Sequence, residues 1–85
     1  MSDELTQMAQ EELNAACSLT WPELKRITPW GDSFEGFAPS GRTVEIERRY
    51  LWALDPEGAI IVEVEVRDAA AREGVETRAI LHAPS

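Results

Sequence analysis

The chain has 85 residues, 44% of them hydrophobic and 28% charged, which is typical of one folded domain with a single modest core. Its formal net charge of −8 repels phosphate backbones and anionic lipids, so we expect no nucleic-acid and no membrane partner. No apolar run approaches the roughly 18 residues of a membrane span. An acidic N-terminus without a following apolar stretch and a single cysteine, Cys17, favour a cytoplasmic location.

The first expected element is an amphipathic helix over residues 3–17. Apolar side chains recur there at helical spacing on one side, namely Leu5, Met8, Ala9, Leu13 and Ala16. Residues 20–23 then have the spacing of a capping box, which predicts a short second helix over residues 21–27. Pro29 ends it, because a proline disfavours the helical conformation of the residue before it.

From Gly31 onward the hydrophobic period is two, which predicts strands at 32–38, 42–54, 59–67 and 75–82. Pro39-Ser40-Gly41 and Pro56-Glu57-Gly58 each predict a three-residue hairpin loop with glycine in the left-handed position. Residues 68–74 form a longer last loop. The expected fold is α+β, a single domain over residues 1–85 with the helices packed on one face of a four-stranded antiparallel meander.

Loop length and hydrophobic pattern together predict the pairing of the strands. A loop at 56–58 sets the pairs Leu54–Ile60, Trp52–Val62, Tyr50–Val64, Glu47–Arg67 and Arg49–Glu65. For the last hairpin, the expected pairs are Val66–Val75, Val64–Thr77, Ile61–Ile80 and Glu63–Arg78. Even-numbered apolar residues of the second and third strands then share one face, and opposite charges alternate on the other.

A structural ion pair is expected between Asp32 and Arg48. The loop at 39–41 places these residues opposite one another, and Arg48 is the one charged residue on the apolar side of its strand. A charge in that position needs a partner, because an unpaired buried cation is very costly. The same register places Phe34 in the core and sets Glu35 opposite Glu45, which is an unfavourable contact.

Gly31-Asp32-Ser33 resembles the nucleophile block of the GDSL hydrolases, in which the serine attacks an ester. That resemblance implies an Asp-x-x-His pattern near the C-terminus, but Ala79 stands three residues before His82, the only histidine. The family's larger α/β/α sandwich also needs a longer chain. We therefore expect no catalytic residue and no enzyme activity, and a hydrolase that uses Ser33 is the remote alternative.

The residues typical of metal and cofactor sites are isolated in this sequence. Cys17 and His82 each stand alone, so no metal site and no cofactor is expected. We expect Cys17 to be a small buried side chain and His82 to be exposed. Trp52 is expected in the core, and Trp21 and Trp30 to anchor the short helix, with an exposed aromatic surface as the alternative.

An apolar patch is expected on the charged face of the sheet, which has no helix left to cover it. Contiguous exposed apolar residues usually mark an interface. The candidate interface residues are Phe37, Leu51, Ala53, Ile61 and Ile80. A two-fold homodimer through this patch is the preferred interpretation, and a monomer whose small patch is partly shaded by Phe37 and the C-terminal residues is the alternative.

Three classes of function follow from these features. The preferred one is a non-enzymatic protein-binding or adaptor module that acts as a homodimer and contacts another protein. The second is an acidic regulator that occupies a basic partner, including a nucleic-acid-binding protein. The third is an enzyme, for which the sequence offers no general base.

Overall fold

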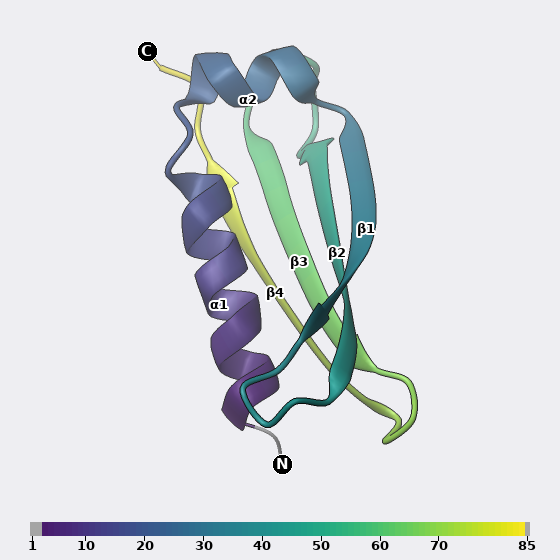
Figure 1. Cartoon of the computed structure of the whole chain (residues 1–85). Coiled ribbons are helices and arrows are strands. Elements are labelled where there is room, and N and C mark those ends of the chain that lie inside the picture. The colour runs from purple at the N-terminus through teal and green to yellow at the C-terminus, as the bar shows by residue number, and fades with distance from the viewer. Residues whose placement is uncertain (1–2, 85) are drawn as a thin grey trace.

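In the computed structural model, which describes residues 3–84, two helices pack on a four-stranded antiparallel sheet (Figure 1). The elements are α1 (Asp3–Cys17), α2 (Trp21–Ile27), β1 (Trp30–Phe37), β2 (Thr43–Trp52), β3 (Ile60–Asp68) and β4 (Glu73–Leu81). The strand order β1-β2-β3-β4 makes the sheet a meander with β1 and β4 at its edges. The predicted α+β class is confirmed.

Helix α1 runs along the sheet and packs on β3 and β4 (Figure 1). Its predicted apolar stripe supplies this contact: Leu5, Ala9, Leu13 and Ala16 are buried, and Met8 is half-buried against them. On the sheet side, alternate β3 residues from Ile60 to Val66 are fully buried, because β3 has a strand on each side and α1 above it. The core therefore lies between α1 and the middle of the sheet.

Helix α2 crosses the end of the sheet (Figure 1). The predicted capping box is present: the Thr20 hydroxyl accepts from the Glu23 amide, and the Glu23 carboxylate accepts from the Thr20 amide. Leu24 is fully buried. The Trp21 indole nitrogen donates to the Gly58 carbonyl at 2.9 Å, which ties α2 to the β2–β3 loop.

Two of the three predicted registers are present. Gly41 has φ of 95°, and the Ala38 amide donates to the Arg42 carbonyl at 2.9 Å, which closes the expected three-residue loop between β1 and β2. The β3–β4 register also follows the prediction, with Ile61 opposite Ile80. Strand β4 begins earlier than expected, so the preceding loop is shorter.

The predicted β2–β3 register is wrong by two residues: Trp52 lies opposite Ile60 instead of Val62. Strand β2 ends at Trp52, earlier than predicted, and the loop to β3 is longer than the predicted three-residue loop at 56–58. The Gly58 amide donates to the Asp55 carbonyl at 3.0 Å, and Glu57 has the positive φ, 67°, that was expected of glycine. A shift of two keeps every strand side chain on its predicted face.

Two apolar residues expected in the core lie outside it. Leu54 belongs to the β2–β3 loop and is 86% exposed, because β2 stops before it. Phe34 points to the helix side of the sheet as expected but remains more than a third exposed. The reason is that α1 covers β3 and β4, whereas Phe34 lies on the far edge strand. Trp52 is half-buried against the core.

Candidate functional site

The side of the sheet that faces away from α1 is called the open face below. It is formed by the odd-numbered residues of β1, β2 and β3 and the even-numbered residues of β4. Within residues 3–84, neither helix covers it. Its charged residues are Glu35, Glu45, Glu47, Glu63, Glu65, Glu76, Arg49, Arg67 and Arg78.

Two arginines organise the charges of the open face. Arg49 contacts Glu47 at 3.0 Å, Glu63 at 3.0 Å and Glu76 at 3.2 Å. Arg67 contacts Glu47 at 3.0 Å and also pairs with Glu45 and Glu65. Hydrogen bonds from Arg67 lower the pKa of Glu47, and those to Glu45 and Glu47 raise the pKa of Arg67. The face is thus a connected network rather than a set of separate pairs.

The register shift changes the predicted charge pairs: each arginine keeps an acid directly opposite it, but Glu47 now lies directly opposite Glu65. Arg67 lies directly opposite Glu45 and Arg49 directly opposite Glu63, in place of Glu47 and Glu65. Arg67 still reaches Glu47 diagonally. Each of the two strands carries two glutamates and then an arginine on this face, so a two-residue shift keeps an acid opposite each arginine and also sets two glutamates opposite one another.

Leu51, Ile61 and Ile80 form one row across β2, β3 and β4 at one end of the open face, here called the apolar row. Ile80 is 53% exposed, Leu51 more than a third exposed and Ile61 half-buried. Ala53 follows the end of β2 and is also exposed. Four of the five candidate interface residues therefore lie at the same end of the open face and are at least partly exposed, namely Leu51, Ala53, Ile61 and Ile80.

Phe37 is on the open face, as its parity predicted, and is 73% exposed, but it lies away from the apolar row. It pairs with Thr43, eight positions along β2 from Leu51. At about 3.3 Å per residue this separation is about 26 Å. Phe37 neither extends nor shades the apolar row, because the two occupy opposite ends of the sheet.

On the helix side of the sheet, Asp32 and Arg48 are opposite one another and form a two-pronged ion pair. The Arg48 Nε and Nη2 donate to the two Asp32 oxygens at 3.1 and 2.9 Å, and this contact raises the pKa of Arg48. The guanidinium carbon lies 5.6 Å from the Trp30 ring centre and 5.2 Å from that of Phe34. Glu12 of α1 is 4.0 Å away on the other side, so Arg48 links β1 to α1.

A second polar cluster, centred on Arg42, was missed by sequence reasoning. Arg42 contacts Glu4 at 2.7 Å, Asp68 at 3.0 Å and Glu73 at 3.1 Å, and so joins α1 to both hairpins at one end of the molecule. Asp68 is only 5% exposed. The available signal was the alternation of β3, whose buried even-numbered positions end on this acidic residue.

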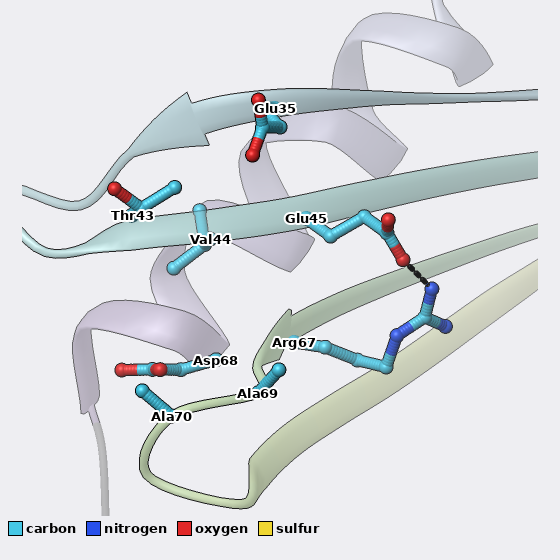
Figure 2. Close-up of a pocket in the computed structure, with 8 residues that line it drawn as sticks. All are labelled: Glu35, Thr43, Val44, Glu45, Arg67, Asp68, Ala69 and Ala70. Carbon is cyan, nitrogen blue, oxygen red and sulfur yellow. Dashed lines mark hydrogen bonds and ion pairs between the residues drawn. The ribbon is translucent and has the colours of Figure 1, made fainter.

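Beside this cluster the surface is hollowed where β1, β2 and the β3–β4 loop meet, with a volume of about 270 Å³ (Figure 2). The figure shows Glu35 and Glu45 on neighbouring strands and Arg67 reaching Glu45. Within residues 3–84, Glu35 has no hydrogen bond or ion pair. The hollow is lined by Glu35, Thr43, Val44, Glu45, Arg67, Asp68, Ala69 and Ala70.

The remaining candidate residues are separate from one another. Ser33 is exposed on the open face opposite Glu47, and His82 is exposed just beyond β4. Cys17 is half-buried at the end of α1, and burial raises the pKa of its thiol. Among the described residues, no three histidine, cysteine or acidic side chains are grouped as a metal site would require. No helix in that part of the chain is both long and apolar enough to cross a membrane.

No protein-family model, curated protein or solved structure matches the chain.

Proposed function

We propose that this protein is a non-enzymatic protein-binding or adaptor module that acts as a homodimer through the open face of its sheet. The observation that carries the proposal is the apolar row of Leu51, Ile61 and Ile80, which lies across three adjacent strands and reaches solvent. Single exposed apolar residues are ordinary, but a contiguous patch rimmed by charges is typical of an interface.

The pattern of the open face also suits pairing with itself. A two-fold axis parallel to the strands and between β2 and β3 would lay each β2 residue on the β3 residue of the same row in the second copy. Leu51 then meets Ile61, Arg49 meets Glu63, and Glu45 meets Arg67. In the remaining row two glutamates meet, Glu47 and Glu65, and each is already paired to Arg67 within its own copy.

An acidic regulator of a basic partner is the second candidate. It is favoured by the excess of acids on the open face, where six glutamates meet three arginines, and by the net charge of −8. Such a partner could be a nucleic-acid-binding protein. Its association would weaken steeply with salt, whereas association through the apolar row would persist.

Substitution of Ile80 by lysine tests the dimer. Ile80→Lys places a charge in the apolar row, and we expect it to convert the protein to a monomer in sedimentation equilibrium while the melting temperature changes little. Leu54→Lys is the matched control, because Leu54 is exposed in a loop and outside the row. Equal masses for Ile80→Lys and the unmodified chain would refute the proposed interface.

A further inference from the structure

The outer side of β1 is a free strand edge. Strand β1 pairs with β2 alone, whereas β4, the other edge strand, lies under α1. The Ala38 amide donates to the Arg42 carbonyl, so these two residues are a hydrogen-bonded pair. In an antiparallel ladder every second residue forms such a pair with the neighbouring strand. The backbone groups of even-numbered residues therefore point to β2, and those of Gly31, Ser33, Glu35 and Phe37 point outward.

Strand β1 lacks the features that usually protect an exposed edge. Such edges are commonly blocked by proline, lysine, a bulge or a covering element. The β1 sequence, WGDSFEGF, holds no proline and no lysine, and all of its residues are half or fully exposed. Two of its aromatic side chains, Trp30 and Phe34, lie on the helix side and keep more than a third of their surface in water.

The β1 edge carries an uncompensated negative charge. Asp32 is neutralised by Arg48, but Glu35 has no partner within residues 3–84 and stands opposite another acid, Glu45. Like charges directly across strands are destabilising. A cation on the outer side of Glu35 would relieve this contact without displacing any ion pair of the protein.

We propose that the β1 edge binds an extended segment of a partner protein in which basic and apolar residues alternate, and takes it up as a fifth strand of the sheet. This inference rests on the proposed protein-binding function and names its partner class. The outward backbone groups supply the hydrogen bonds. Basic side chains face Glu35 on the open face, and apolar side chains pack against Trp30 and Phe34 on the helix side.

A second copy of this chain fits the β1 edge less well than a basic segment does. Consider two β1 edges paired antiparallel, with the open faces of the two sheets on the same side and the two-fold axis at a residue from Asp32 to Glu35. In each such register, Asp32 or Glu35 lies directly opposite the same residue of the second copy or two positions from it. That spacing is at most about 7–8 Å, which brings like charges together. The net charge of −8 on each copy adds to this repulsion and attracts a basic segment instead.

The test uses a capped decapeptide of alternating lysine and valine, with a glutamate-for-lysine peptide as its control, and reads amide shifts by NMR. We expect the lysine peptide to shift the amides of Gly31, Ser33, Glu35 and Phe37. Ser33→Pro removes an outward amide without breaking the β1–β2 ladder, and should weaken binding about tenfold, whereas Ser33→Ala should not. Glu35→Lys should weaken it similarly, with Glu11→Lys on α1 as the control of equal net charge.

Three results would overturn the proposal: no binding of the lysine peptide, undiminished binding by both β1 variants, or shifts confined to the glutamates of the open face. A monomeric mass for Ser33→Pro, with a dimeric mass for Ile80→Lys, would show instead that a second copy occupies the edge. The proposed dimer and the proposed peptide site are tested separately, because Ile80 lies on β4, away from the β1 edge, and Ile80→Lys should bind the peptide with unchanged affinity.

Discussion

Arg48 is a charged side chain on the helix side of the sheet, where Asp32 meets two of its nitrogens. The substitution Asp32→Asn removes the negative charge and leaves Glu12, 4.0 Å away, as the nearest acid. Because the pair is partly exposed, we expect a loss of about 1 kcal/mol, or a fall in melting temperature of about 4–8 °C. Ser33→Ala, at the next position but on the opposite face, should change it little. Equal melting temperatures for the two variants in thermal denaturation would contradict this role.

Glu47 makes the stability of the fold depend on pH. Its hydrogen bond from Arg67 lowers its pKa below the ordinary value of 4.5. The folded state therefore binds fewer protons than the unfolded state, and stability present above that value is lost as the pH falls through the folded pKa. Denaturation with urea at several pH values should show a decline below about pH 4.5 that is shallower in Glu47→Gln. An identical decline in that variant would exclude Glu47 as a contributor.

Predictions about single residues were confirmed where the local sequence determined both the sheet face of a residue and the pairing of its strand. Asp32 and Arg48 were paired correctly because a three-residue loop with glycine at Gly41 defines their hairpin. The Arg42 cluster was missed, because its partners come from α1 and from the adjoining ends of β3 and β4. Strand pairing sets Asp68 opposite Glu73, but neither pairing nor spacing along the chain brings them to Arg42 and α1.

At the scale of elements, helix α2 is short and depends on its anchors for stability, since isolated helices of this length are marginal in water. Leu24 is its buried side chain. We expect Leu24→Ala to reduce the free energy of unfolding by about 2–4 kcal/mol. Ile27→Ala in the same helix, at an exposed position, should cost less than about 1 kcal/mol. Urea denaturation of both variants checks this, and similar losses would show that Leu24 is not the anchor.

The β2–β3 hairpin shows what hydrophobic alternation leaves open. A shift of two residues preserves the face of every side chain, so the alternation is satisfied by both the predicted and the observed register. Loop geometry decides between them. The proline-to-glycine segment of this hairpin forms a turn with Glu57 in the left-handed region, inside a longer loop to which Trp21 bonds. That contact comes from α2 and was not visible in the hairpin's own sequence.

At the scale of the whole molecule, the elongated fold, 43 × 18 × 16 Å, has one side of its sheet occupied by α1 and the other side open. The apolar row could be predicted from the sequence: the spacing of Leu51, Ile61 and Ile80 placed them on the open face, and strand pairing brought them into one row. Phe37 was misjudged because parity gives the face of a residue but not its distance along the strand.

The mass of the unmodified chain in solution tests the proposed homodimer most directly. Sedimentation equilibrium over low to high micromolar concentrations, at low and at high salt, should show the mass rise from 9.5 kDa toward twice that value. The rise should persist at high salt, because the apolar row supplies the contact. A mass of 9.5 kDa throughout the range would contradict the dimer.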